Sequence, residues 1–163
     1  MRVQQEIGFA APCEIVWEIL LDWEAQARWM RDADRVEVLS PMRRGVGTTI
    51  AVRTRVLGVP LFTERLEVTV WEPPNCLVMA HRSILRGSGT WQLMPAGDGC
   101  RFRWTEDVAL PVPVLGEIAL RTYRPFLRWL MGGALGDLRS HIERERHVDR
   151  DVPRVSRPDE RSL

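Results

Sequence analysis

Apolar and polar residues alternate along the first nine positions of the chain. Val3, Gln5, Ile7 and Phe9 fall on one side of an extended segment, and charged or polar residues fall on the other. A period of two residues is typical of a strand with one buried face. We therefore expect a strand over residues 2–9.

The spacing of apolar residues then changes to that of a helix. Pro12 suits the first turn of a helix, where a missing backbone N–H costs nothing. Ile15 and Ile19 follow at helical spacing, and a second short amphipathic segment over residues 24–30 brings Trp29 into the same neighbourhood. We expect two short helices after the first strand.

From residue 34 onward the period returns to two, interrupted by short turns. The expected strands cover residues 34–40, 47–57, 60–71, 76–85, 88–95 and 100–109. Connections this short favour antiparallel neighbours, because a parallel crossover needs a dozen residues or more. The inward face of the strand at 76–85 stays open, since the side with Met79 and the side with Val78 are equally apolar.

After residue 113 the apolar residues step mostly by four, which predicts a helix to about residue 146. Pro125 should kink or split this helix, because its ring blocks the hydrogen bond to residue 121. Gly132, Gly133 and Gly136 each cost a helix about 1 kcal/mol relative to alanine. Two reasons for them stay open, which are close approach to the sheet and room for a ligand.

Length and composition fit one globular domain, since the chain has 163 residues of which 45% are hydrophobic. We expect residues 1–146 to form it and the charged segment 147–163 to be a disordered tail. The net charge is +1 with acids and bases interspersed, which argues against a nucleic-acid partner. The start lacks a secretory pattern and no apolar run approaches the roughly 20 residues of a membrane span, so a cytoplasmic protein is expected.

The cysteines are Cys13, Cys76 and Cys100, an odd number without a CxxC motif or a nearby histidine. We interpret them as small buried side chains and expect neither a disulfide framework nor a zinc site. Phosphate-binding glycine loops, HExxH and GxSxG are absent from the sequence. No metal and no cofactor are expected.

Several segments carry a family resemblance: residues 7–22 (IGFAAPCEIVWEILLD), Trp29, 70–77 (VWEPPNCL), 89–95 (GTWQLMP) and 99–104 (GCRFRW). With the order of elements, they resemble the START-related, birch-pollen-allergen-like superfamily (SRPBCC), in its polyketide cyclase/dehydrase branch. The resemblance implies an α+β helix-grip fold, in which a curved seven-stranded antiparallel sheet encloses a cavity with a long C-terminal helix. It implies binding of a small hydrophobic molecule such as a lipid, polyketide or quinone, but it assigns no catalytic residue.

Polar residues on apolar strand faces are the candidates for chemistry. Glu64 and Glu106 share faces with apolar neighbours, and His81 lies beside Leu77 and Met79 on one side of its strand. A buried carboxylate takes a raised pKa or a charged partner, so these three residues could exchange protons. In the alternative, His81 is a pocket wall and each glutamate lies at the sheet rim or pairs with an arginine such as Arg53, Arg55 or Arg103.

Aromatic side chains are the candidate ligand contacts, because rigid aromatic surface binds flat apolar molecules with little loss of entropy. The expected contacts are Trp29, Phe62, Trp91, Trp104, Tyr123 and Phe126. Plain core packing is the alternative for each tryptophan, and Tyr123 with Arg124 is a candidate gate beside Pro125.

Three functions are compatible with these observations. The first is binding or carriage of a small hydrophobic ligand, and the second is a polyketide cyclase or dehydratase that moves protons with Glu64, His81 or Glu106. The third is a protein-interaction module. The identity of the ligand, the presence of catalysis and the oligomeric state stay open.

Overall fold

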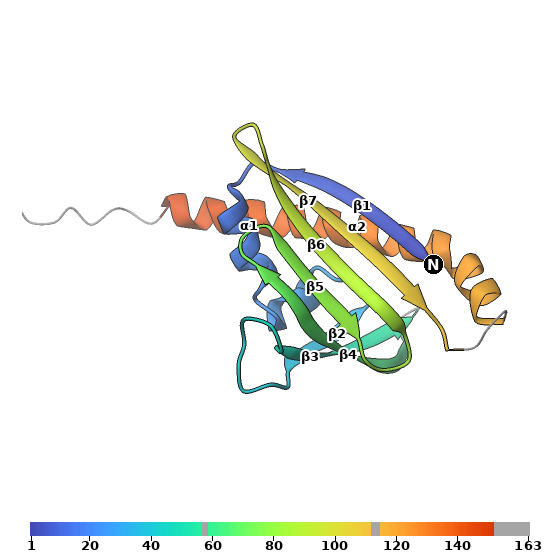
Figure 1. Ribbon diagram of the computed structural model, residues 1–163. Coiled ribbons are helices and arrows are strands. Elements are labelled where there is room, and N and C mark those ends of the chain that lie inside the picture. The colour runs from blue at the N-terminus through green and yellow to red at the C-terminus, as the bar shows by residue number, and fades with distance from the viewer. Residues whose placement is uncertain (57–58, 112–114, 152–163) are drawn as a thin grey trace, which may run out of the picture.

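The computed structural model describes residues 1–56, 59–111 and 115–151 (Figure 1). Its elements are β1 (Arg2–Phe9), α1 (Cys13–Leu20), η1 (Glu24–Arg28), β2 (Ala33–Val38), β3 (Thr49–Val56), β4 (Val59–Glu72), β5 (Cys76–His81), β6 (Arg86–Ala96), β7 (Gly99–Ala109) and α2 (Leu115–Asp151). The element η1 is a 3-10 helix.

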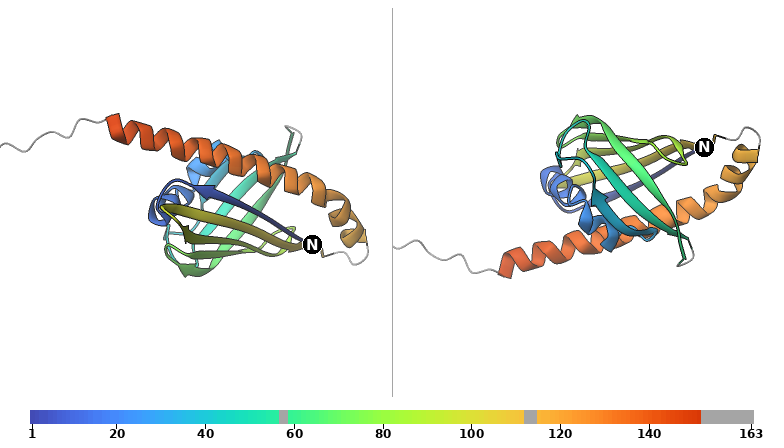
Figure 2. Two further views of the ribbon diagram at one scale, coloured as in Figure 1. Left: turned by 90° about the horizontal axis from the view of Figure 1, so that it is seen from above. Right: turned by 90° about the horizontal axis from the view of Figure 1, so that it is seen from below.

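The seven strands form one sheet in the order β1-β7-β6-β5-β4-β3-β2, and every neighbouring pair is antiparallel. The sheet curves, and α2 runs along its open side next to β1 (Figure 2). Gln5 and Arg139 tie helix to strand, since Gln5 Nε2 donates to the carbonyl of Arg128 and Arg139 Nη2 donates to that of Gly8. The expected α+β class, with a curved seven-stranded antiparallel sheet, two short helices and a long C-terminal helix, is confirmed.

Several element boundaries differ from those expected. Pro12 caps α1 from outside the helix, and the strand expected over residues 76–85 ends at His81. Helix α2 continues to Asp151 instead of about residue 146, while the rest of the expected tail, 152–163, lies outside the described residues. Pro125 lies inside α2, and of the two expected effects the helix shows no split but a bend toward its N-terminal end (Figure 2).

The inner face of the central strands is set by a β-bulge. The register between β4 and β5 shifts between Val68 and Val70, so the alternation expected to continue through Val70 is interrupted. Trp71 instead pairs with Leu77 and packs against the core. Leu77 and Met79 are buried, which places the His81 side of β5 inward and answers the question the sequence left open.

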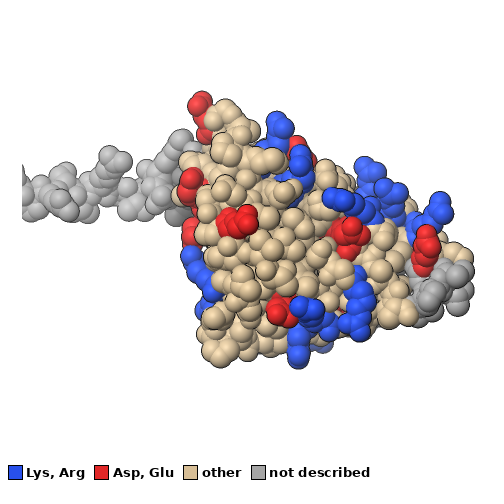
Figure 3. Space-filling view, viewed as in Figure 1, with Lys and Arg blue, Asp and Glu red and all other residues tan. Residues whose placement is uncertain are grey.

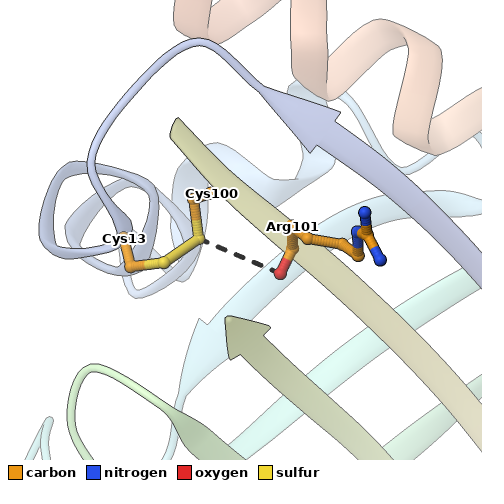
Figure 4. The surroundings of a disulfide bond; sticks show 3 residues. All are labelled: Cys13, Cys100 and Arg101. Atoms are coloured by element: carbon orange, nitrogen blue, oxygen red, sulfur yellow. Dashed lines mark hydrogen bonds between the residues drawn. A yellow bond between two sulfur atoms is a disulfide. The ribbon is translucent and has the colours of Figure 1, made fainter. Parts of the chain in front are cut away.

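A disulfide bond joins Cys13 and Cys100, contrary to the expectation that the cysteines are unpaired (Figure 4). The pairing of β1 with β7 places Phe9 opposite Cys100. The turn into α1 then brings Cys13 back over the first residues of β7, so the two Cα atoms lie 4.9 Å apart despite 87 residues of separation. Cys76 is a free thiol.

The glycines of α2 do not serve close approach to the sheet. A Cβ at Gly133 would lie 2.5 Å from Nη1 of Arg31, so this glycine makes room for a guanidinium. Arg31 Nε forms an ion pair with Asp137 Oδ2 at 2.7 Å. Gly132 and Gly136 are exposed, and a Cβ at Gly136 would meet nothing within 4 Å.

Candidate functional site

His81 lies between two carboxylates on the inner side of the sheet. Its Nε2 lies 3.1 Å from Glu106 Oε2, and its Nδ1 lies 3.6 Å from Glu64 Oε1. The side chains of His81, Glu64 and Glu106 are only 9%, 5% and 13% exposed. The structure thus brings together the three residues that the sequence suggested for proton transfer, whose role stays a prediction.

Gly89 makes the contact between His81 and Glu106 possible. Glu106 is on β7 and His81 is on β5, so strand β6 separates them. Gly89 of β6 pairs with Glu106, and a Cβ there would lie 2.7 Å from Glu106 Oε1. The carboxylate therefore reaches across β6 over the space that a side chain at position 89 would fill. Sequence reasoning missed this residue, although a glycine inside a strand often marks a close approach.

Two further hydrogen bonds hold the carboxylates in place. Trp104 Nε1 donates to Glu106 Oε1 at 2.6 Å, and the backbone N–H of Ser83 donates to Glu64 Oε1 at 3.2 Å. Burial acts to lower the pKa of His81, but the hydrogen bond and negative charge of Glu106, together with Glu64, outweigh it and raise that pKa. The imidazole is thereby biased toward its charged form.

The alternative in which arginines neutralise the two glutamates is wrong. Arg53 and Arg55 pair with Asp34, and Arg103 pairs with Glu6. Within the described part of the chain, His81 is the basic side chain that forms ion pairs with Glu64 and Glu106.

Asp32, just before β2, adds a third acid that the sequence did not single out. Burial, followed by the negative charge of Glu106, raises the pKa of the Asp32 carboxyl group. Burial and the charge of Asp32 likewise raise the pKa of Tyr123, a residue of α2. The charge of Glu106 thus acts on Asp32, and the charge of Asp32 acts on Tyr123. No pattern in the sequence around Asp32 signals this position.

The predicted aromatic contacts form two groups. Trp91 has ring centroids 6.4 Å from Trp29 and 6.3 Å from Trp104, so these three tryptophans form one buried cluster. Tyr123 and Phe126 lie on α2 with centroids 5.3 Å apart. The sixth residue, Phe62, is half-buried on β4, two positions before Glu64, and belongs to neither group.

Several buried polar atoms around this region have no hydrogen-bond partner among the described residues. Four belong to candidate site residues, namely Trp29 Nε1, Trp91 Nε1, Glu64 Oε2 and His81 Nδ1. Buried polar groups are almost always satisfied, because an unsatisfied one costs about 1–3 kcal/mol. The region thus offers both donors and acceptors to a molecule that enters it.

The described residues contain no cluster of three or more histidine, cysteine, aspartate or glutamate side chains able to hold a metal ion. Among the described helices, none is long and apolar enough to cross a membrane.

Comparison with solved structures shows the same fold in several proteins. The protein TTHA0849 from Thermus thermophilus is 21% identical with a TM-score of 0.74 over 89% of this chain and 99% of its own. The Zhui aromatase/cyclase from Streptomyces sp. R1128 is 18% identical with a TM-score of 0.74 over 89% and 94%. A START superfamily protein from Mycobacterium smegmatis is 18% identical with a TM-score of 0.63 over 88% and 98%.

Comparison with curated protein sequences found no match. The family model described as polyketide cyclase/dehydrase and lipid transport matches residues 1–143, nearly the whole of the described chain. Together with the helix-grip architecture, this match confirms the resemblance that the sequence segments and the order of elements suggested. The chain belongs to the polyketide cyclase/dehydrase and lipid transport family, within the START-like group of folds.

Proposed function

We propose that the protein binds a small, largely apolar molecule between the inner face of the sheet and the first half of α2. The polar group of that molecule lies against His81, Glu64 and Glu106, which we call the His81 cluster. The observation that carries this proposal is the position of His81 between Glu64 and Glu106, with Trp104 of the tryptophan cluster hydrogen-bonded to Glu106. Stability alone does not explain a buried cluster of charges, because a protein with apolar residues of equal volume in its place is often as stable or more stable.

The unsatisfied atoms support a ligand with at least one oxygen. Trp29 and Trp91 each hold an indole N–H without an acceptor, which suits a carbonyl or hydroxyl oxygen. Glu64 Oε2 lacks a donor, which suits a hydroxyl group. The tryptophan rings supply the apolar contact area that binds a flat or extended carbon skeleton.

Native mass spectrometry of the freshly purified protein tests this proposal in the first instance, because a co-purified apolar molecule adds its mass to that of the chain. A probe titration complements it. Quenching of tryptophan fluorescence by 2-naphthol, compared with naphthalene, separates the contribution of the hydroxyl group. We expect 2-naphthol to bind at least tenfold more tightly, which corresponds to about 1.4 kcal/mol. Equal affinity for the two compounds would contradict a role for the polar cluster in binding.

Catalysis of ring closure or dehydration on a polyketide chain is the second candidate, and a specific observation favours it. The raised pKa of His81 and its contact with two carboxylates form an acid–base set at one point of an apolar interior. His81 in its neutral form would accept a proton from a carbon between two carbonyl groups and return one to the oxygen formed by ring closure. Several proteins with this fold are described as aromatase/cyclases.

The variants E64Q, E106Q and H81Q separate carriage from catalysis. A carrier leaves a linear poly-β-ketone thioester unchanged, and E64Q or E106Q weakens its 2-naphthol affinity by no more than the roughly tenfold contribution of the polar cluster. A cyclase converts that thioester, and its turnover falls roughly 100-fold or more in at least one of the three variants. A matched variant of an exposed pair, E18Q, should change neither property.

A further inference from the structure

An open groove lies between the first residues of β1 and the first half of α2. Its volume is about 370 Å³, and it is lined by Arg2, Val3, Gln4, Arg124 and Arg128. Most arginines on the strands pair with an acid. In contrast, no described acidic side chain forms an ion pair with Arg2, Arg124 or Arg128. Arginine side chains gather over β1 and this end of α2, with some acidic side chains among them (Figure 3).

The outward side of α2 next to this groove carries large apolar side chains. Ile118 and Trp129 are 57% and 60% exposed. At 100° per residue, Ile118, Arg121, Pro125 and Trp129 lie along one line of the helix, and Arg121 and Pro125 are exposed as well. Trp129 is held by stacking on Phe126, with ring centroids 5.8 Å apart.

We define the basic crest as Arg2, Ile118, Arg121, Arg124, Arg128 and Trp129. Its four positive charges face two nearby acids, Glu117 in the first turn of α2 and Asp107, the strand partner of Arg2. Neither acid forms an ion pair with a crest arginine within the described part of the chain. The crest therefore keeps a positive charge beside exposed tryptophan and isoleucine.

We propose that the basic crest docks on the surface of a phospholipid bilayer that contains anionic lipids. Arginines bind lipid phosphates at the rim of the bilayer, and tryptophan prefers the boundary between head groups and acyl chains. The groove between Arg2, Arg124 and Arg128 offers a place for one phosphate group. Helix α2 bends toward its N-terminal end (Figure 2), where Ile118 and Trp129 are exposed beside the arginines. This combination suits a bilayer, which offers anionic head groups above an apolar interior, better than a folded acidic protein.

Co-sedimentation with vesicles tests the proposal on the full chain. We expect binding to vesicles of phosphatidylcholine and phosphatidylglycerol, weak binding to vesicles of phosphatidylcholine alone, and loss of binding as salt is raised. Each neutralised arginine should weaken the partition roughly fivefold, so R124Q/R128Q should lose roughly 25-fold. W129A should also weaken binding to anionic vesicles, because its exposed indole ring is then missing from the boundary between head groups and acyl chains.

R43Q/R44Q is the matched control, because it removes the same charge from exposed arginines that pair with Glu24 and Glu18. The proposal is overturned if this control loses as much vesicle binding as R124Q/R128Q, or if neutral vesicles bind equally well. It is overturned too if sodium phosphate releases the protein far more effectively than sodium chloride of equal ionic strength, since a free-phosphate site is then indicated. Circular dichroism confirms that each variant is folded.

Discussion

The backbone of Gly89 lies beneath the carboxylate of Glu106, so closely that a Cβ at position 89 would stand 2.7 Å from Oε1 and 3.2 Å from Oε2. This absence of a side chain allows Glu106 to reach His81 from two strands away. Gly89 therefore allows Glu106 to be part of the site, although Gly89 itself contributes no reacting atom.

The substitution G89A should push the Glu106 carboxylate away from His81. Because the hydrogen bond and charge of Glu106 raise the pKa of His81, that pKa should fall in the variant. We expect a loss of stability of about 1–3 kcal/mol, as for other insertions into packed sites. Titration of the His81 imidazole by NMR measures the first effect, and urea denaturation measures the second.

G8A is the control for this experiment. Gly8 lies in β1, and a Cβ there would meet nothing within 4 Å. We expect G8A to leave the pKa of His81 unchanged and to alter stability by no more than about 0.5 kcal/mol. An unchanged pKa of His81 in G89A, with the fold intact, would show that the contact between Glu106 and His81 does not depend on the space above Gly89.

Stability should fall as pH rises through neutrality, because the pKa of His81 is higher in the folded protein than the ordinary value of 6.5. The stabilising contribution of such a group is fully present below pH 6.5 and is lost as pH rises through the folded pKa. Asp32 contributes in the same direction at lower pH, since its pKa in the folded protein is raised as well. Its stabilising contribution is present below its ordinary pKa of 3.8 and is lost as the pH rises above that value.

The free energy of unfolding, measured in urea at a series of pH values, tests this account in the unmodified protein and in H81Q. The step above pH 6.5 should be present in the first and absent from the second. If H81Q retained it, another group would be responsible.

Reduction of the Cys13–Cys100 disulfide should destabilise the fold. The bond joins two residues that are 87 positions apart in the sequence. Because the bond restricts the unfolded chain, its reduction should lower the free energy of unfolding by about 2–5 kcal/mol. C13S/C100S should show a similar loss in thermal unfolding without reductant. C76S, which removes the free thiol, is the control: it should be as stable as the unmodified protein without reductant and should lose the same stability when reductant is added. Equal melting temperatures with and without reductant would mean that the bond contributes nothing.

The exposed glycine Gly136 should be a site of stabilisation. A Cβ there meets nothing within 4 Å, so G136A should raise the free energy of unfolding by up to about 1 kcal/mol. G133A should gain less, because its Cβ would force the Arg31 guanidinium away from Asp137. Urea denaturation of the two variants side by side measures the difference, and a larger gain for G133A would contradict this geometry.

The fold could be predicted because its signals are local. Alternation in each strand and the step of four in α2 depend on neighbours in sequence, and they placed Glu64 and Glu106 on buried faces. The end of β5 at His81 was harder to predict, since Ile84 falls on the same alternating side as Val78 and Ala80 although it is 49% exposed.

The site could be predicted only in part because it depends on register. The registers of β5 with β6 and of β6 with β7 decide which residues meet across β6, and neither register is visible in the sequence. Cys13 and Cys100 met for a similar reason, since only the pairing of β1 with β7 brings them together. Asp32 acquires its environment from residues more than 70 positions away.

NMR of the ¹⁵N-histidine-labelled protein during titration with 2-naphthol tests most directly whether the polar group of a bound ligand contacts His81. H81Q assigns the His81 signals. We expect the imidazole signals of His81 to shift and saturate with the affinity obtained from fluorescence, while those of His141 stay in place. Saturable binding of 2-naphthol that leaves the His81 signals unmoved would contradict it.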